Sequence, residues 1–115
     1  MKIKDSNITL MVKNMDKACA FYAMIGLKLK KRWEDYYAMY EAPGVVIGLH
    51  PSDGKPKGSG DASIGFFIEN IKDAEKLLTK NKVKFKFDDG DSGKYIHFKD
   101  PDGNILYFTQ PSWKY

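Results

Sequence analysis

With 115 residues, 43% of them hydrophobic, the chain is long enough for one domain with a buried core and too short for two independent ones. The net charge of +4 comes from 19 Lys and Arg residues spread along the chain against 15 Asp and Glu, without a nucleic-acid-binding motif, so no nucleic-acid partner is expected. The composition excludes a disordered chain, no apolar run approaches the roughly 20 residues of a membrane-spanning helix, and the single cysteine excludes an internal disulfide. We therefore expect one cytoplasmic domain over 1–115 that has no membrane partner.

The chain opens with a predicted strand over 7–12, where apolar residues alternate with a mixed set at the two-residue period of a strand. Asn14 can cap a helix, which is predicted over 15–25 because apolar residues recur there at three- and four-residue spacing. Gly26 is expected to end this helix in the left-handed conformation. Cys19 lies inside the helix and is expected to be a buried filler, not a nucleophile. Three strands follow, at 27–33, 36–42 and 45–50.

A second copy of the same pattern follows residues 51–62, a stretch rich in Gly, Pro and Ser that is predicted to be a linker. Asn70 stands 56 residues after Asn14, and nine apolar or capping positions match in that register. The second copy is predicted to contain a strand from Ser63, a helix over 71–81 and strands at 83–88, 93–99 and 105–110. The chain is thus predicted to be α+β, with a βαβββ unit repeated over about 5–50 and about 63–110.

Two such units, with the segment 14-NMDKACAFYAMIGLKL-29 and a D-P-D-G-N turn opening the last strand, resemble the glyoxalase, bleomycin-resistance and extradiol-dioxygenase superfamily, also named vicinal oxygen chelate proteins. The resemblance covers about residues 5–110. It implies that each unit bends its strands into a half-barrel, so that barrel-like mixed sheets surround one cavity. It also implies a divalent metal held by the first and last strands of each unit. A homodimer is implied as well, because members usually build or bury their cavities across chains.

The resemblance assigns the metal-ligand positions to Asn7, Gly48, Ser63 and Tyr107. Glycine offers no donor side chain, serine is a poor ligand, and transition metals are normally held by imidazole, thiolate or carboxylate groups. His50 and His97 have no carboxylate partner nearby in sequence, so a two-histidine metal site is not favoured, and contact with a ligand is the expected role of either. The sequence therefore predicts no metal and no other cofactor.

Strand parity divides the predicted strands into a cavity face and a core face. The cavity face of the four strands that carry these positions has no charged residue, and Gly48 and Gly65 are expected to leave room for a ligand there. The opposite face, which begins with Ile8, is apolar and is expected to pack beneath the helices. The faces taken by Trp33, Tyr36, Tyr37 and Tyr40 stay open. The ligand-binding candidates are Asn7, Thr9, Met11, Trp33, Gly48, His50, Ser63, Phe67, Tyr107 and Thr109.

Three functions compete at this point. The favoured one is a metal-free protein that binds a small, partly aromatic or antibiotic-like molecule, although a cationic drug such as bleomycin does not suit a basic chain. The second is a lyase, isomerase or dioxygenase with an atypical site, and an acid–base enzyme using His50 and Tyr107 has no supporting spacing, so we lean against catalysis. The third is a structural or regulatory dimer with a plugged interior. The tail that contains Trp113 and Tyr115 is expected either to cap the barrel or to pack on a partner.

Overall fold

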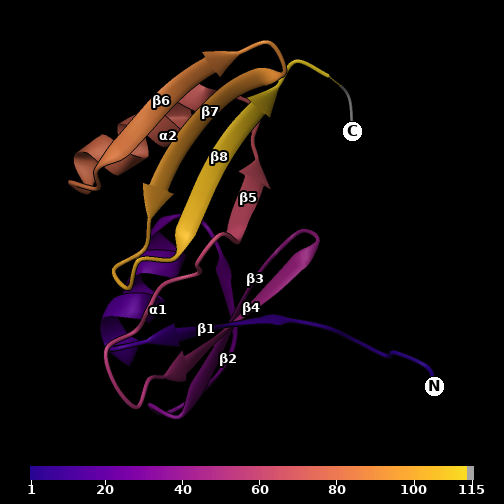
Figure 1. Cartoon of the computed structure of the whole chain (residues 1–115), viewed down its shortest axis with the longest axis vertical. Coiled ribbons are helices and arrows are strands. Elements are labelled where there is room, and N and C mark those ends of the chain that lie inside the picture. The colour runs from indigo at the N-terminus through magenta and orange to yellow at the C-terminus, as the bar shows by residue number, and fades with distance from the viewer. Residues whose placement is uncertain (114–115) are drawn as a thin grey trace. The chain divides into compact units, whose positions relative to one another are not determined.

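The computed structural model describes residues 1–113, and the chain divides into two compact units, Met1–Gly58 (unit one) and the residues from Ser59 onward (unit two). Each unit has the order strand, helix, strand, strand, strand (Figure 1). The α+β class and the doubled βαβββ unit are therefore confirmed. The prediction that residues 1–115 form a single domain stays a prediction.

Unit one builds a mixed four-stranded sheet in the order β1-β4-β3-β2, with β1 parallel to β4 and the other pairs antiparallel. Helix α1 packs on this sheet, and the core between them contains Val12, Tyr22, Ile47 and Leu49. Ile8, expected in that core, is 45% exposed at the start of its strand. The elements of unit one are β1 (Ile8–Val12), α1 (Met15–Met24), β2 (Lys28–Trp33), β3 (Tyr37–Ala42) and β4 (Val45–Pro51).

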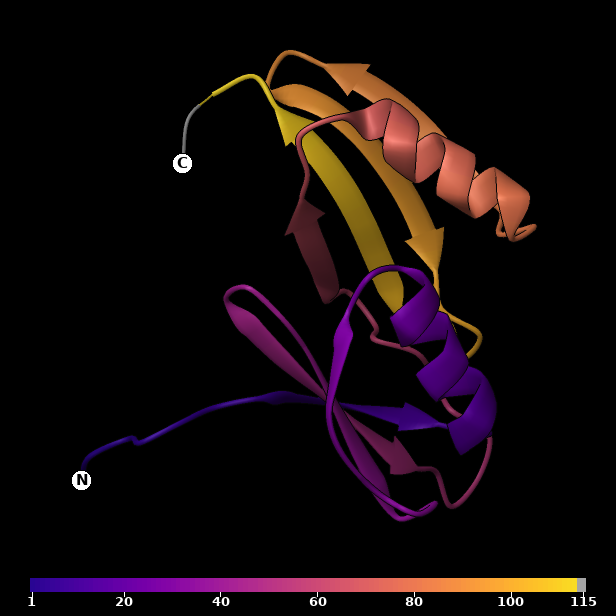
Figure 2. The ribbon, with the colours of Figure 1, turned by 180° about the vertical axis from the view of Figure 1, so that it is seen from behind.

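Unit two repeats this arrangement in the order β5-β8-β7-β6, again with one parallel pair, β5 and β8. Figure 2 shows α2 lying across one face of this sheet, where Leu78, Ile96 and Leu106 are fully buried. The elements of unit two are β5 (Ser63–Phe67), α2 (Ile71–Lys80), β6 (Phe85–Gly90), β7 (Gly93–Lys99) and β8 (Ile105–Pro111). The strand expected at 83–88 begins two residues later, because the backbone of Val83 is used to end α2.

The two helices begin and end in the same way. The Asn14 side chain accepts the Lys17 backbone N–H at 3.0 Å, and Asn70 accepts that of Lys72 at 3.0 Å, so both predicted N-caps are confirmed. Gly26 has a φ of +109° after α1, as predicted. Lys82, its counterpart after α2, takes a φ of +58°, a conformation that is costly for a residue with a Cβ.

The turn before β8 is a buried hydrogen-bonded corner. The Asp100 carboxylate accepts the backbone N–H groups of Asp102 and Asn104, each at 2.9 Å, and the Asn104 side-chain amide at 2.7 Å. Both Asp100 and Asn104 are buried. In addition, Ser59 Oγ accepts the Ile105 N–H at 2.8 Å, so the end of the predicted linker is tied to the start of β8. This corner fixes where β8 begins, and with it the position of Tyr107.

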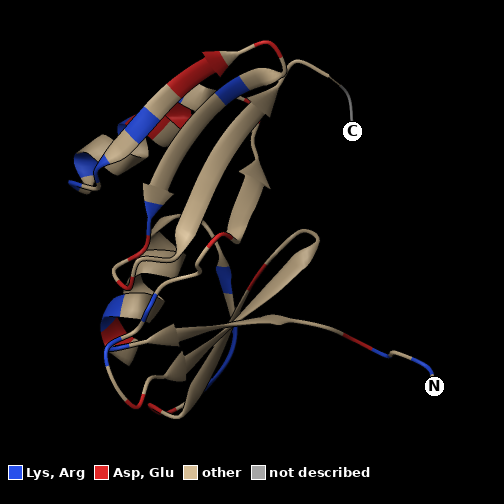
Figure 3. Cartoon of the chain, in the orientation of Figure 1, with Lys and Arg blue, Asp and Glu red and all other residues tan. Residues whose placement is uncertain are grey.

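Charged residues avoid four of the strands. β1, β4, β5 and β8 contain no Lys, Arg, Asp or Glu, whereas the edge strands β2 and β6 carry several, as Figure 3 shows for β5, β8 and β6. No helix within residues 1–113 is both long and apolar enough to cross a membrane. Cys19 is buried, as expected for a filler. Trp113 contacts Phe67 edge-on at 5.6 Å, while Tyr115 lies outside the described residues.

Candidate functional site

The face of the unit-one sheet away from α1, here named open face one, is defined by the alternation of β3. Ala38 and Tyr40 are buried toward the helix, whereas Tyr37, Met39 and Glu41 alternate with them and lie on the open face. Trp33 of β2 pairs with Tyr37 in register and contacts its ring at 5.8 Å. The sequence does not determine the faces of these aromatic residues, and the structure assigns three of them. Tyr40 belongs to the core, and Trp33 and Tyr37 belong to the open face. Tyr36, in the turn between β2 and β3, is 74% exposed.

A hydrogen-bonded trio occupies the middle of open face one. The Asn7 side-chain amide donates to the Tyr37 hydroxyl at 2.7 Å, and that hydroxyl also shares a hydrogen bond with Thr9 Oγ1 at 3.0 Å. The trio lies over Gly48: a Cβ at this position would stand 2.5 Å from Tyr37 Cζ and 3.0 Å from Thr9 Oγ1. The room expected beside Gly48 is thus taken up by a tyrosine of the same sheet.

The remaining candidates of unit one border this trio. His50 lies two residues after Gly48 on β4, with its ring centroid 6.3 Å from that of Tyr37 and its Nδ1 2.7 Å from the Pro51 carbonyl oxygen. Met11 is an exposed apolar side chain further along β1. Open face one therefore combines a phenol, an amide, a hydroxyl and an imidazole with aromatic and thioether surface.

Unit two repeats the glycine and tyrosine arrangement on its own open face, here named open face two. Gly65 of β5 and Tyr107 of β8 are register partners, and a Cβ at Gly65 would overlap the Tyr107 ring. Three rings form a cluster there: His97 stacks on Tyr95 at 5.9 Å and is tilted against Tyr107 at 6.0 Å, and the two tyrosine rings lie 6.0 Å apart. Ser63, the remaining ligand position, is exposed at the start of β5. The space expected beside Gly65 is therefore filled as well.

Thr109 stands on the same face as Tyr107 but is only 2% exposed, with Phe67 and Tyr95 as its neighbours in register. Its hydroxyl is buried and has no hydrogen-bond partner among the described residues. A buried hydroxyl without a hydrogen-bond partner lowers the stability of the fold by about 1–3 kcal/mol, and a partner for this group would recover that loss. At 2% exposure this hydroxyl is not reached from the surface in this structure, so ligand contact by Thr109 stays a prediction.

The four positions assigned by resemblance do not fit a divalent metal ion. Gly48 carries no donor and the space beside it holds the Tyr37 hydroxyl, while Asn7 already donates to that hydroxyl. Ser63 and Tyr107 are neutral groups, and a dication held by neutral donors keeps its charge uncompensated. Within residues 1–113, no three His, Cys, Asp or Glu side chains of either unit gather closely enough to hold a metal ion.

Two perturbed groups lie away from the open faces. Arg32 donates hydrogen bonds to Asp16 at 2.7 Å and to Asp35 at 2.8 Å, and the bond to Asp16 connects β2 to α1. These hydrogen bonds raise the pKa of the guanidinium above its ordinary value. Burial, followed by the Cys19 thiol, raises the pKa of Tyr40 to about 12. Both groups belong to the structure of unit one, and neither reaches the Tyr37 trio.

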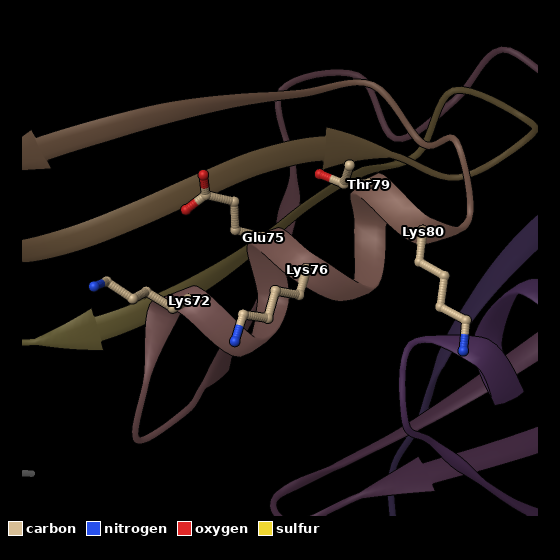
Figure 4. A pocket seen from close by; sticks show the side chains of 5 residues that line it. All are labelled: Lys72, Glu75, Lys76, Thr79 and Lys80. Atoms are coloured by element: carbon tan, nitrogen blue, oxygen red, sulfur yellow. The ribbon is translucent and has the colours of Figure 1, made fainter.

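A surface hollow on α2 is a weaker candidate. It is lined by Lys72, Glu75, Lys76, Thr79 and Lys80. Figure 4 shows these side chains diverging along the helix, with the lysines extended in different directions. A binding site needs polar groups that converge on a ligand, so we interpret this surface as the solvated face of an amphipathic helix.

Three contributors to the open faces, Tyr37, Tyr95 and His97, are not placed on them by strand parity. Tyr37 was left undecided, although Glu41, four residues later on the same parity, marks that face as the solvated one. Tyr95 is not among the predicted contacts, and His97 is predicted to contact a ligand without a defined role, although the two hold the positions in β7 that Tyr37 and Met39 hold in β3. The pairing of the strands supplies that correspondence, and it is hard to obtain from strand parity alone.

Comparison with solved structures shows the same fold in proteins of low sequence identity. The fosfomycin resistance protein FosX of Listeria monocytogenes superposes with a TM-score of 0.81 at 19% identity, with 97% of this chain and 96% of that chain covered. A second FosX structure, complexed with Mn(II) and sulfate, gives 0.78 at 21% identity over 97% and 93%. A glyoxylase/bleomycin resistance protein/dioxygenase domain from Frankia sp. EAN1pec gives 0.76 at 20% identity over 100% and 96%. Likeness at this identity establishes the fold alone.

No curated protein matches the chain significantly. The family model of the Glyoxalase/Bleomycin resistance protein/Dioxygenase superfamily matches residues 6–108, which is nearly the whole of the part with regular structure. This match covers both βαβββ units, the Asn14 and Asn70 caps and the Asp100 corner. The chain therefore belongs to the Glyoxalase/Bleomycin resistance protein/Dioxygenase superfamily.

Proposed function

We propose that this chain is a metal-free protein that binds, and so sequesters, a small, partly aromatic, antibiotic-like molecule on the open faces of its sheets. The observation that carries the proposal is the Tyr37 trio, which places a neutral hydrogen-bonded group where the resemblance puts metal ligands. One FosX structure is complexed with Mn(II) and sulfate, and the alternative to our proposal is that this chain also holds a metal. The donors of this chain favour hydrogen bonding to an organic ligand over coordination of an ion.

The trio has unused hydrogen-bonding capacity. A tyrosine hydroxyl offers one donor and two acceptor positions, and an asparagine side chain adds a carbonyl oxygen. Asn7 uses its N–H group toward Tyr37, and no described residue donates to its Oδ1. Trp33 and His50 flank the trio with flat surfaces. Such a surface suits a planar ligand that carries a few hydrogen-bonding atoms.

We expect each open face to offer ligand contacts of its own. In unit one they come from Asn7, Thr9, Met11, Trp33, Tyr37, Gly48 and His50. In unit two they come from Ser63, Phe67, Tyr107 and Thr109. The homodimer implied by the resemblance is part of the same proposal, and the mass of the purified protein by light scattering distinguishes it from a monomer.

A ligand screen tests the proposal. Purified protein is analysed for bound metals and screened by thermal shift against aromatic and antibiotic compounds, since a ligand that binds the native state raises its melting temperature. Amide chemical shifts then locate each hit. We expect each hit to shift the amide signals of β1, β3 and β4. The Tyr37→Phe substitution should lower the affinity for the hits about fivefold, in line with the loss of one hydrogen bond.

The matched control is Tyr36→Phe, which removes a hydroxyl from the exposed neighbour and should leave the affinity unchanged. One equivalent of a tightly bound Zn, Ni, Mn or Fe ion in the purified protein would contradict the proposal and favour a lyase, isomerase or dioxygenase. A screen without hits would favour a structural or regulatory role.

A further inference from the structure

Strand β2 contains a bulge that changes the charge of open face one. Lys28 pairs with Glu41 and Leu29 with Tyr40, but Lys31, not Lys30, pairs with Met39. Lys30 is therefore the extra residue of a β-bulge, which places two residues opposite one on the partner strand. A regular strand would have directed Lys30 and Lys31 to opposite faces.

Two contacts show that both lysines reach the open face. Lys30 lines a hollow of about 200 Å³ together with Asn7, Met39 and Val46, which are residues of the open face or of the segment before β1. Lys31 Nζ lies 4.8 Å from the centroid of the Trp33 ring, the same ring that contacts Tyr37. Lys30 thus lines the same hollow as Asn7 of the Tyr37 trio, and the Lys31 ammonium group lies beside Trp33.

Neighbouring charges leave these two lysines uncompensated. Arg32 is turned toward α1, where it pairs with Asp16 and Asp35, and Lys28 stands opposite Glu41. Neither Lys30 nor Lys31 forms an ion pair with a residue in 1–113. The hollow beside Lys30 contains one carboxylate, Asp5, whose Oδ1 already accepts the Ser6 N–H at 2.8 Å. Glu41 also lies on open face one, opposite Lys28, so this side of the face carries Lys28, Lys30 and Lys31 against two carboxylates, Asp5 and Glu41.

We propose that the ligand of open face one carries an oxyanion, such as a carboxylate or a phosphate, and that Lys30 and Lys31 bind it while Trp33 and Tyr37 contact its ring. This inference rests on the proposed function and adds the charge class of the ligand. A hollow of about 200 Å³ is smaller than the roughly 300–1,000 Å³ of a complete drug site, so it fits one group of a larger molecule. The bulge supplies the physical reason, because it gives one face two adjacent cations.

The experiment compares probes of one shape and different charge by NMR titration of isotope-labelled protein in low salt. Benzoate and phenyl phosphate are the anionic probes, and benzamide is the neutral one. We expect both anions to shift the amides of β2 and β3 and to bind at least about fivefold more tightly than benzamide, as for charge pairs at a protein surface. A preference between the two anions separates a carboxylate ligand from a phosphate ligand.

Charge substitutions give the sign of the effect. Replacing both lysines, Lys30→Gln and Lys31→Gln, should lower the affinity for benzoate about five- to tenfold. Asp5→Asn should raise that affinity about twofold. Lys55→Gln, in the exposed stretch after β4, is the control for net charge and should have no effect. The differences should shrink at high salt, because exposed charges are screened.

Equal binding of benzoate and benzamide, or wild-type benzoate affinity in the double lysine variant, would overturn the inference and leave the proposed function standing. If no probe and no compound from the ligand screen perturbs either open face, the proposed function itself fails.

Discussion

Adding a single methyl group at Gly48 is expected to disrupt the Tyr37 trio. The new Cβ would lie 2.5 Å from Tyr37 Cζ and 3.0 Å from Thr9 Oγ1, both well inside normal contact distance. The strand backbone cannot yield without breaking its pairing to β1 and β3, so the tyrosine ring must rotate away. In Gly48→Ala the Tyr37 hydroxyl then leaves Asn7 and Thr9.

The cost follows from the contacts that are lost. Two hydrogen bonds to the Tyr37 hydroxyl are worth about 0.5–1.5 kcal/mol each, at the lower end on an exposed face. The contact of Tyr37 with Trp33 adds about 0.5–1 kcal/mol. Replacing the glycine also lowers the conformational entropy of the unfolded chain, which offsets about 0.4–1 kcal/mol of this loss of stability. We therefore expect Gly48→Ala to lower the free energy of unfolding by about 1–2 kcal/mol.

Urea unfolding followed by circular dichroism measures this difference, and a double-mutant cycle isolates its cause. In the Tyr37→Ala background the space beside position 48 is vacant, so Gly48→Ala should be neutral or slightly stabilising. Gly54→Ala is the matched control, because a Cβ there meets nothing within 4 Å. If Gly48→Ala has the same effect with and without Tyr37, to within about 0.5 kcal/mol, the tyrosine does not fill that space and our reasoning about the trio is refuted.

Three further changes test the structure around the site. Lys82→Gly should raise the free energy of unfolding by up to about 1 kcal/mol, because Lys82 holds the left-handed conformation that Gly26 holds in the first unit. Asp100→Asn should lower it by about 1–3 kcal/mol, since the new amide faces the Asn104 amide donor; urea unfolding measures both. Burial raises the pKa of Tyr40 to about 12, so unfolding between pH 10 and 12 releases a proton. The free energy of unfolding should therefore fall by up to about 1.4 kcal/mol per pH unit in that range. Tyr40→Phe should lack this loss when unfolding is measured across the same range.

Each of these predictions has a contradicting outcome. A destabilised Lys82→Gly variant would mean that this residue is held by contacts and not merely tolerated. An Asp100→Asn protein as stable as the wild type would show that the buried corner does not determine where β8 begins. Equal pH dependence of the wild type and Tyr40→Phe above pH 10 would show that this phenol is not protected by burial.

The sequence predicted the repeated unit well because local rules act on it directly. Asn14 and Asn70 cap their helices through a side chain one turn from the amide they bind, so a single position suffices to locate each helix start. Strand alternation separated the buried Leu106 and Phe108 from the half-buried Tyr107 between them. These features depend on residues only a few positions apart.

The errors concern contacts between strands. The bulge at Lys30 lies in a run of lysines where alternation carries no signal, so the charge of open face one was not foreseen. Gly48 was expected to leave room for a ligand, but the residue that fills this room, Tyr37, comes from another strand. The sequence places Val83 in a strand, but its backbone N–H ends α2 instead. That role depends on the left-handed conformation of Lys82 before it, which the sequence does not show. Pairing and backbone conformation decide such positions, and sequence parity alone does not.

Titration of Mn²⁺ into isotope-labelled protein tests most directly whether neutral groups have replaced a metal site. A bound paramagnetic ion broadens the amide signals near it, so the amides of Asn7, Gly48, Ser63 and Tyr107 report on the four ligand positions. We predict that submillimolar Mn²⁺ causes no selective, saturable broadening at any of them. Saturable broadening at these amides with one equivalent of Mn²⁺, relieved by a chelator, would contradict the account.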